Sequence, residues 1–534
     1  MVLTISPSTL VFVLALITTV AWARPGSEDI DERDTAHQVH RTRRSRGIKD
    51  FNPEDDSEFW INGAQNLLST KLGRKPITGQ AKNVIMFLGD GFSIPTLAAA
   101  RVYLGQSLGA TGEETVLSFE EFPNTGLSKT YCVDSQVADS SCSATAYLGG
   151  VKGNIGTAGV TGRVKVDDCA AMRNVSNQVP SILKWSQDAG KSTGVVTTTR
   201  ITHASPSGTY AYIANRDWEN DAEIKNSGQD PDICDDIAEQ LVNKLPGKNI
   251  NVILGGGRKE FRPRDFTDED GTPGSRTDDV DLIEVWKADK VGRNASFRYL
   301  WNRDQIMSVD PTDSDYVLGL FNRDHLEYHL LANRRKEPTL EEMTTFAVQA
   351  LKKNPNGFFL FVEGGRIDMG LHDNKAHLAL DEAVEFANAV QAAVDLTDEE
   401  DTLIVVTADH AHTLSISGYP VRGNNIFGIS GTSSVDNLPY ATLSFANGPG
   451  YKQPEEDGTR YDISRDNTMD ANYEFPATSP LYSETHGGDD VAVFARGPWS
   501  HLYAGAFEQN FIPHVMAYAS CVGNGRTSCN DNRK

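Results

Sequence analysis

The chain has 534 residues, of which 39% are hydrophobic and 23% are charged, as in an ordinary globular protein. This composition excludes a collagen, an intrinsically disordered chain and a membrane protein with many spans. The 73 acidic residues outnumber the 50 lysines and arginines, which gives a net charge of −23. Such an acidic surface lacks the basic patch that nucleic-acid binding requires. An anionic ligand would need a site where nearby groups make the local charge positive.

The N-terminus predicts export. Residues 1–23 carry no charged side chain, and an apolar run over residues 10–20 precedes an A-W-A cleavage sequence that ends at Ala23. We expect a secretory signal peptide, because the run is too short to span a bilayer; an N-terminal anchor helix is the alternative. Residues 24–50 form a polar arm, which is either a propeptide cut near Arg44 or a solvated tail.

Export would permit disulfide bonds and glycosylation. The six cysteines are Cys132, Cys142, Cys169, Cys234, Cys521 and Cys529. Sequence alone does not select a pairing, although the short loop favours Cys521 with Cys529. Glycosylation sequons begin at Asn174 and Asn294. The C-terminal sequence C-N-D-N-R-K lacks the apolar tail of a GPI signal, so we expect a soluble extracellular protein without a membrane anchor.

From about residue 81, short apolar runs alternate with helical patterns. Six of these runs are Asn83–Leu88, Thr193–Thr199, Asn251–Leu254, Phe358–Val362, Thr402–Thr407 and Val491–Ala495. They are continuous rather than alternating, as strands buried on both faces are, and Ala376–Leu396 has helical periodicity. This pattern predicts an α/β fold, with a central, mostly parallel β-sheet flanked by helices, in one catalytic domain over 51–534. The polar, Gly-rich stretch over about 420–484 predicts a small inserted lobe.

Polar side chains follow several of the predicted strands. In chain order they are Asp90, His203, Ser205, Glu363, Asp409 and His410, and the further candidates Asp368, His372 and His486 lie close by. Each residue alone is more typical of a turn or a surface, but ligands bind beyond the carboxyl ends of such strands. Asp and His suit Zn²⁺, and carboxylates with a hydroxyl suit Mg²⁺. The set therefore predicts a multi-metal site acting on a phosphoester.

Ser140 is the predicted nucleophile. Asp139 is a good N-cap for the helix predicted after it, so Ser140 would lie where free N–H groups and the helix dipole stabilise an anion. Ser141 and Ser143 are the rival candidates. Arg216 is the predicted phosphate clamp, because a guanidinium binds two phosphate oxygens at once; the alternative is an ion pair with the adjacent Asp217.

Taken together, the motifs resemble those of alkaline phosphatases of the animal type, with an insect-like character. The resemblance runs from about Phe59 to Cys529 and rests on N-V-I-M-F-L-G-D-G, D-S-S-C-S-A-T-A-Y-L, T-T-T-R-I-T-H-A-S-P-S-G-T-Y, F-L-F-V-E-G-G-R-I-D, V-T-A-D-H-A-H and E-T-H-G-G-D-D-V-A-V-F-A-R-G-P. It implies a secreted phosphomonoesterase of broad specificity and a homodimer in which the inserted lobe is crown-like.

The resemblance also assigns roles to the site residues. It implies one Zn²⁺ on Asp368, His372 and His486, a second Zn²⁺ on Asp90, Asp409 and His410, and Mg²⁺ on Asp90, Ser205 and Glu363. Ser140 would be phosphorylated in turnover and Arg216 would orient the phosphate. The family pattern pairs Cys169 with Cys234 and Cys521 with Cys529, which leaves Cys132 and Cys142 for a third bridge.

Other positions differ from the family or lie beside its ligands. The resemblance places His203 and His412 next to the metal ligands, while Met369 stands where relatives have His or Lys. Animal relatives also bind Ca²⁺, but Asn322 stands where Glu is expected, so the resemblance does not carry that Ca²⁺ to this chain. The alternatives are a phosphodiesterase or sulfatase of the same superfamily and an inactive binding glycoprotein. A sulfatase motif is absent from the sequence, and all eight expected metal ligands are present.

Overall fold

The computed structural model describes residues 53–530; the predicted signal peptide and polar arm lie outside them. The chain divides into two units, Met1–Asp56 and Ser57–Lys534. In the first, Pro53–Asp55 form a short 3-10 turn. The second begins with α1 (Ser57–Gly73), which is exposed along its length. No helix in the described part of the chain is long and apolar enough to cross a membrane.

The second unit is built on a ten-stranded sheet of order β17-β2-β16-β8-β1-β7-β3-β4-β6-β5. Its strands are β1 (Asn83–Gly89), β2 (Asn124–Lys129), β3 (Ser192–Arg200), β4 (Val252–Gly256), β5 (Phe297–Leu300), β6 (Tyr316–Leu320), β7 (Phe358–Gly364), β8 (Thr402–Ala408), β16 (Val491–Arg496) and β17 (Gly505–Glu508). Only β16 runs against the others, because it pairs antiparallel with both β8 and β2. The predicted mostly parallel sheet is confirmed, and all six predicted runs are strands in it.

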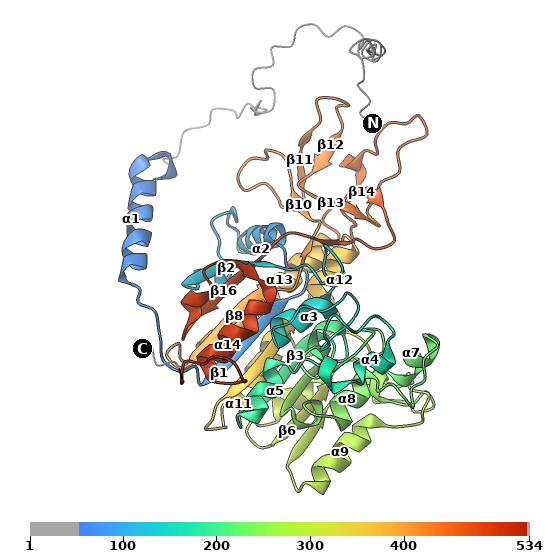
Figure 1. Cartoon of the computed structure of the whole chain (residues 1–534). Coiled ribbons are helices and arrows are strands. Elements are labelled where there is room, and N and C mark those ends of the chain that lie inside the picture. Colours follow the sequence, from blue (N-terminus) through green and yellow to red (C-terminus); the bar gives the residue numbers. More distant parts are fainter. Residues whose placement is uncertain (1–52, 531–534) are drawn as a thin grey trace, which may run out of the picture. The chain divides into compact units, whose positions relative to one another are not determined.

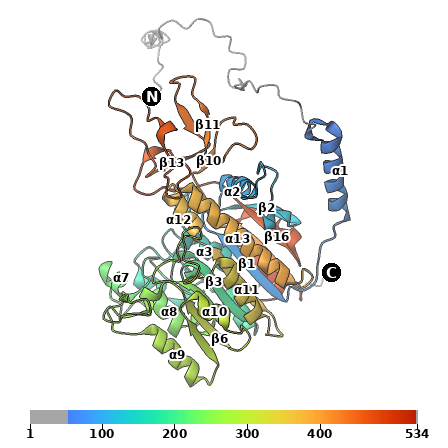
Figure 2. The same cartoon turned by 180° about the vertical axis from the view of Figure 1, so that it is seen from behind.

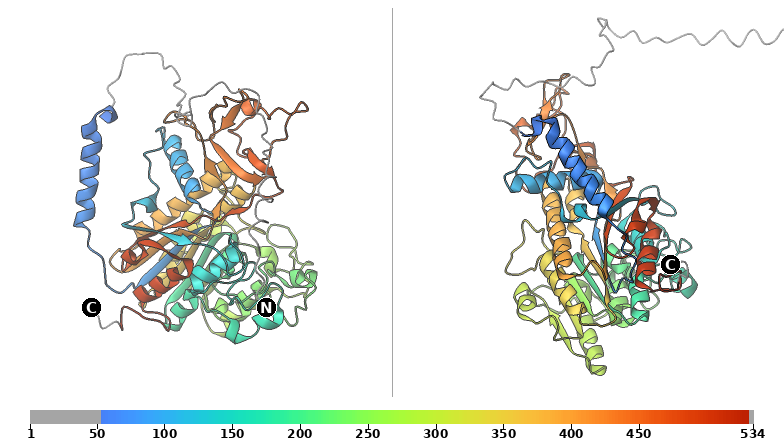
Figure 3. Two further views of the ribbon diagram at one scale, coloured as in Figure 1. Left: turned by 45° about the horizontal axis from the view of Figure 1, so that its top comes forward. Right: turned by 90° about the vertical axis from the view of Figure 1, so that its left-hand side faces the viewer.

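Helices cover both faces of the sheet. They are α2 (Ile94–Ser107), α3 (Ser140–Gly149), α4 (Cys169–Met172), α5 (Ile182–Asp188), α6 (Ala204–Ser207), α7 (Asp221–Asn226), α8 (Ile237–Asn243), α9 (Leu282–Gly292), α10 (Arg303–Ser308), α11 (Leu340–Leu351), α12 (Arg366–His372), α13 (Ala376–Leu396) and α14 (Ile512–Ser520). In Figure 1, α3, α5 and α14 lie in front of the sheet, and the reverse view in Figure 2 shows α11 and α13 on the other face. The side view in Figure 3 shows the same separation, with the orange α13 and the red α14 on opposite sides.

Each face of the sheet carries its own apolar core. Ile85 and Phe87 of β1 belong to one core, whereas Val84, Met86 and Leu88 belong to the other. Successive side chains of a strand point to opposite faces, so a strand covered on both faces must be apolar at every position. This burial is why the predicted runs are continuous.

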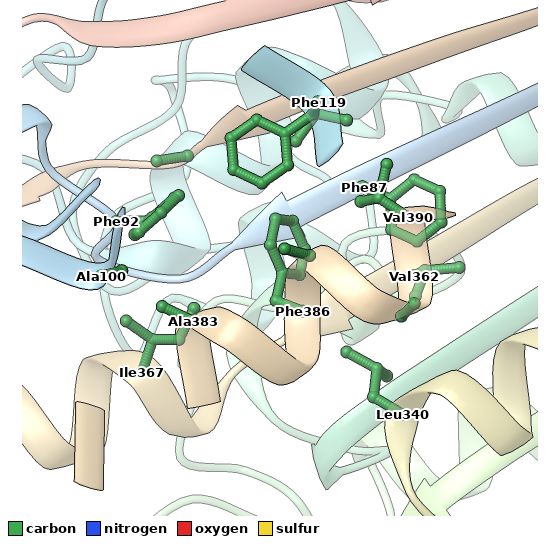
Figure 4. Close-up of a cluster of buried hydrophobic side chains, with 14 of the residues drawn as sticks. Phe87, Phe92, Ala100, Phe119, Leu340, Val362, Ile367, Ala383, Phe386 and Val390 are labelled. Carbon is green, nitrogen blue, oxygen red and sulfur yellow. The ribbon is translucent and has the colours of Figure 1, made fainter. Parts of the chain in front are cut away.

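Aromatic rings fill the core under α13. Phe386 of α13 lies edge-on to Phe87 of β1, with ring centroids 5.9 Å apart, and to Phe119 at 6.0 Å (Figure 4). Phe92, just after β1, contacts both Phe119 and Phe386 in the same way. Edge-to-face packing of this kind stabilises the core beyond simple burial of area. It fixes the carboxyl end of β1 against α13.

The segment predicted as an insert folds into two small sheets. Its strands are β10 (Ser415–Ile416), β11 (Ile429–Thr432), β12 (Pro439–Ala441), β13 (Leu443–Gly448) and β14 (Ala477–Pro480). One sheet joins β10, β13 and β14, and the other joins β11 and β12, at the top of Figure 1. The short strand β9 (Ala411–His412), which follows β8, pairs antiparallel with β15 (His486–Gly487), which precedes β16, so the chain leaves and re-enters the central sheet side by side.

Candidate active site

Three adjacent strands deliver carboxylates to one edge of the sheet. Asp90 follows β1, Asp409 follows β8, and Glu363 is the penultimate residue of β7. The sheet order is β8-β1-β7, so these three side chains come from neighbouring strands. All three residues have 0% of their surface exposed. The structure thus brings together the strand-end residues that the sequence predicts, at a depth where isolated charges are costly.

The first cluster surrounds Asp90. His410 Nε2 lies 3.5 Å from Asp90 Oδ1 and 3.1 Å from Asp409 Oδ2. Ser140 Oγ donates to Asp90 Oδ1 at 3.5 Å and lies 3.2 Å from His410 Nε2. Asp90, Asp409 and His410 have one ligand atom each within 4.8 Å of one another, which is close enough to hold a single cation.

The second cluster combines one carboxylate with histidines. Asp368 and His372 lie one turn apart on α12, with His372 Nε2 3.3 Å from Asp368 Oδ2. His486 on β15 brings its Nε2 to 3.0 Å from His372 Nε2 and 3.4 Å from Asp368 Oδ1. Together with His412, these residues have one ligand atom each within 4.8 Å of one another, and ring nitrogens with a carboxylate form a donor set typical of Zn²⁺.

His412 lies beside this second cluster and is held between two carboxylates. Its Nε2 is 2.6 Å from Asp368 Oδ1, and its Nδ1 contacts Glu484. Although burial acts to lower it, these two partners raise the pKa of His412 to about 10. The charged His412 and its neighbour His372 outweigh the burial of Asp368 and hold the pKa of that carboxyl well below its usual range. His412 therefore orients an ionised Asp368.

Glu484 belongs to the site although its sequence does not single it out. This residue is 1% exposed, its carboxylate contacts His412, and it accepts from the backbone N–H of Thr413 at 2.7 Å. Its backbone carbonyl oxygen also lies 2.5 Å from His372 Nδ1. The available signal is its place two residues before His486, in the E-T-H motif. Glu484 thus orients two histidines without reaching the cluster itself.

A third group of oxygen atoms lies on the other side of Asp90. Ser205 of α6 donates to Asp90 Oδ2 at 3.5 Å, so the two oxygens of Asp90 face different groups. Thr197 Oγ1 donates to Glu363 Oε2 at 2.5 Å, and Thr199 Oγ1 donates to the same atom at 3.2 Å. Burial raises the pKa of Glu363 to about 7 against these hydrogen bonds. The predicted Mg²⁺ ligands are therefore all oxygen donors, and Ser205 contacts Asp90 directly.

The first turn of α3 separates the three candidate serines. Asp139 is the N-cap, and its side chain accepts from the backbone N–H of Cys142 at 3.1 Å. Ser141 Oγ donates to Asp139 Oδ2 at 2.5 Å, and Ser143 Oγ donates to the backbone oxygen of Ser140 at 3.0 Å. Only Ser140 among these three directs its hydroxyl at the first cluster. It does so at a helix N-terminus, where an anion is stabilised.

Arg216 reaches this helix start from the side. Its Nη1 donates to Asp139 Oδ2 at 3.0 Å, and its Nη2 lies 3.3 Å from His203 Nε2. The ion pair that the sequence left as an alternative therefore exists, but with Asp139. This ion pair joins the guanidinium to the residue that precedes Ser140. It is compatible with phosphate binding because an Arg has five N–H donors.

Two positions that differ from the resembled family have clear contacts. Met369 follows Asp368 on α12, and its sulfur accepts from Arg366 Nη1 at 2.9 Å. A thioether brings neither charge nor a hydrogen-bond donor to this place. At the position in doubt for Ca²⁺, the Asn322 amide donates to Glu337 Oε1 at 2.7 Å and so occupies a carboxylate oxygen.

The structure contains three disulfides, which join Cys132 to Cys142, Cys169 to Cys234 and Cys521 to Cys529. The last two are the pairs that the resemblance implied, and the first is the bridge expected for the two cysteines that it left over. Both sequon asparagines are exposed, as glycosylation requires: Asn174 caps a short 3-10 turn, and Asn294 follows α9 with a φ of 55°.

Comparisons with known proteins agree with this geometry. The family model described as Alkaline phosphatase matches residues 81–522. The chain is 50% identical over 481 residues to "Membrane-bound alkaline phosphatase" of Bombyx mori, which covers 89% of this chain and 87% of that protein. It is 46% identical over 483 residues to "Alkaline phosphatase, tissue-nonspecific isozyme" of Homo sapiens, covering 89% and 91% of the two chains.

Among solved structures, the alkaline phosphatase from the Antarctic bacterium TAB5 matches with a TM-score of 0.56 at 22% identity, over 84% of this chain and 100% of that one. This match concerns the fold alone. The family model and the relatives cover far more than half of the chain, with the strand-end carboxylates, both histidine-containing clusters and Ser140 inside the matched region. The chain therefore belongs to the alkaline phosphatase family.

Proposed function

We propose that this phosphomonoesterase acts through a phosphoserine at Ser140, in a site that holds two Zn²⁺ and one Mg²⁺. The observation that carries the proposal is the direction of the Ser140 hydroxyl. It lies 3.2 Å from His410 and within 3.5 Å of Asp90, at the N-terminus of α3. Nucleophile, cation ligands and anion-stabilising helix end thus meet at one point.

The donor sets fit these metals. Asp368, His372 and His486 would hold one Zn²⁺, Asp90, Asp409 and His410 the other, and Asp90, Ser205 and Glu363 the Mg²⁺. Among the described residues, Glu363 Oε1 and Asp409 Oδ2 are buried oxygens without a hydrogen-bond donor. Burial and the neighbouring carboxylates raise the pKa of Asp90 well above its usual value. Bound cations would neutralise this buried group of carboxylates and favour its ionised form.

When bound, the metals would supply Lewis-acid stabilisation and lower the pKa of a coordinated hydroxyl or water. The residues of the chain do the rest. Ser140 Oγ forms a bond to phosphorus while the alcohol oxygen leaves, and water then breaks the Ser140 ester to release phosphate. Each displacement inverts the configuration, so the net result is retention. The α3 N–H groups and Arg216 stabilise the phosphoryl charge throughout.

Removal of the metals is expected to abolish activity. Treatment with a chelator should lower the rate of p-nitrophenyl phosphate hydrolysis by at least about 10³-fold, because charge stabilisation at the phosphoryl group is lost. Addition of Zn²⁺ together with Mg²⁺ should restore the rate, and Ca²⁺ should not. Bis(p-nitrophenyl) phosphate is the control substrate, and its faster hydrolysis would favour a phosphodiesterase. Full activity without bound metal would contradict the proposal, whereas a metal-loaded but inert protein would favour a binding glycoprotein.

Substitution of Arg216 is expected to weaken phosphate binding more than turnover. Arg216→Ala should raise KM and the inhibition constant of inorganic phosphate by about 10- to 100-fold, as expected for lost charge-assisted hydrogen bonds. Arg216→Lys keeps the charge but lacks the forked pair of N–H donors, so its KM and phosphate inhibition constant should lie between those of the wild type and Arg216→Ala. Steady-state kinetics with phosphate as inhibitor decide the result. An unchanged phosphate inhibition constant in Arg216→Ala would contradict the assignment.

We infer export and dimerisation on separate grounds. Exposed sequons and three disulfides are typical of an extracellular protein. The exposed helix α1 presents Phe59, Leu67 and Leu72 to solvent, which favours burial against a second copy. Sedimentation of the purified protein tests the dimer. Because the Bombyx mori relative is named membrane-bound, fractionation of expressing cells into medium and membrane pellet tests export.

A further inference from the structure

A disulfide encloses the loop that ends at Ser140. Cys132 lies just beyond β2, Cys142 is the third residue of α3, and the bridge spans a sequence separation of 10. Both cysteines are buried, with 3% and 1% of their surface exposed. Since β2 pairs with both β16 and β17, the bridge connects the first turn of α3 covalently to the region next to a fixed strand of the sheet.

Three consecutive residues of the enclosed loop, Ala138, Asp139 and Ser140, make contacts with the site. The backbone oxygen of Ala138 lies 2.8 Å from His486 Nδ1, which sets the direction of that ring. Asp139 accepts from Arg216 at 3.0 Å, and Ser140 is directed at Asp90 and His410. A shift of this loop would therefore move a cluster ligand, the phosphate clamp and the nucleophile together.

Apart from the bridge, polar contacts and a small apolar cluster hold the loop in place. Cys132, Ala138 and Cys142 form a small buried cluster of their own, separate from the two large cores. Between Thr130 and Asp139 the chain has no helix or strand, and most of the residues in its middle are exposed. Its other anchors are the ion pair of Asp139 with Arg216 and hydrogen bonds, such as that from Val133 N–H to Gly153 O at 2.9 Å. The disulfide is thus the main covalent and apolar restraint on this loop.

We propose that Cys132 and Cys142 are positioning residues for the phosphoryl-transfer reaction. This inference rests on the proposed role of Ser140. The bridge keeps the first turn of α3 in register with Arg216 and His486, which belong to other elements. A misplacement of about 1 Å between reacting groups lowers rates by about 10²-fold. Loss of the bridge should therefore reduce the rate of Ser140 phosphorylation, while Tm should fall no further than after loss of another bridge of similar loop length.

The test compares two double variants. Cys132→Ala/Cys142→Ala removes the proposed positioning bridge, and Cys521→Ala/Cys529→Ala removes a bridge of similar loop length, with a sequence separation of 8. Bridges of similar loop length are expected to stabilise a fold similarly, so the change in Tm should be comparable. We expect kcat to fall about 10- to 100-fold in the first variant and less than about twofold in the control. Bound zinc is measured in both, and rapid acid quench gives the rate of phosphoenzyme formation.

A second measurement decides the matter if the first variant fails to fold. Wild-type protein is treated with increasing reductant until half of the Cys132 and Cys142 thiols can be alkylated, and the state of each bridge is mapped by mass spectrometry. Activity should follow reduction of the Cys132–Cys142 bridge and not that of the Cys521–Cys529 bridge.

Activity that survives reduction or removal of the Cys132–Cys142 bridge would overturn the inference, as would an equal kcat loss in both variants. These outcomes leave the proposed function intact as long as the wild type forms phosphoserine. A wild-type protein that forms none overturns the proposed function itself.

Discussion

Ser140→Ala is expected to lower kcat for p-nitrophenyl phosphate by at least about 10³-fold, while bound zinc stays at the wild-type level. The Ser140 hydroxyl contacts Asp90 and His410, so its removal deletes the nucleophile and leaves the carboxylates and histidines in place. A small residual rate should remain, because the site can still stabilise the phosphoryl group during direct attack by water. Kinetics and metal analysis on the same sample check both parts.

Ser143→Ala is the matched control for that variant. Ser143 is a buried serine of the same helix, and its hydroxyl donates to the backbone oxygen of Ser140 instead of facing the first cluster. We expect its kcat to stay within about tenfold of wild type, since one neutral hydrogen bond is lost. Ser140→Ala with wild-type kcat, or Ser143→Ala with the larger loss, would contradict the assignment of the nucleophile.

Asp90→Asn is expected to disturb two metal positions with one substitution. Asp90 Oδ1 faces His410 and Ser140, whereas Oδ2 faces Ser205. Asn retains the shape but loses the negative charge and one oxygen donor, so affinity should fall on both sides. We expect kcat/KM to decrease by at least about 10³-fold and metal content to fall by more than about one ion per chain.

Asp373→Asn provides the control for this substitution. Asp373 ends α12 close to the histidine cluster, but its carboxylate pairs with Lys375 at 2.9 Å and is about half exposed. Exposed ion pairs of this kind contribute little, so metal content and kcat should be close to wild type. If Asp90→Asn retains all of its zinc and magnesium, Asp90 does not bridge the two positions.

The fold could be predicted from the sequence where burial leaves a simple pattern. Asn83–Gly89 and Phe358–Gly364 are buried on both faces, so they read as unbroken apolar runs and were found almost to the residue. Strands with a mixed pattern were missed: Asn124–Lys129 alternates between exposed and buried positions and contains Gly and Lys, and Gly505–Glu508 is largely exposed at the sheet edge. Strand order was also not predicted, because it depends on contacts between distant segments.

The candidate site was likewise predictable only where the sequence pattern is local. Asp90, Glu363 and Asp409 were predictable because they follow apolar runs and carry groups that bind metals. Glu484 was not, since it acts through His412, and its place two residues before His486 does not by itself reveal that contact. The ion pair of Arg216 with Asp139 was equally hidden, because 77 residues separate the two partners.

Trapping the intermediate tests the central claim most directly. The metal-loaded protein is mixed with a phosphate monoester, quenched in acid within milliseconds and digested, and the phosphorylated peptide is sequenced by mass spectrometry. We predict one phosphate on Ser140, formed in the wild type and in Ser143→Ala and absent from Ser140→Ala and from the chelated protein. Turnover without any phosphoenzyme, or a phosphate on another residue, would contradict the account.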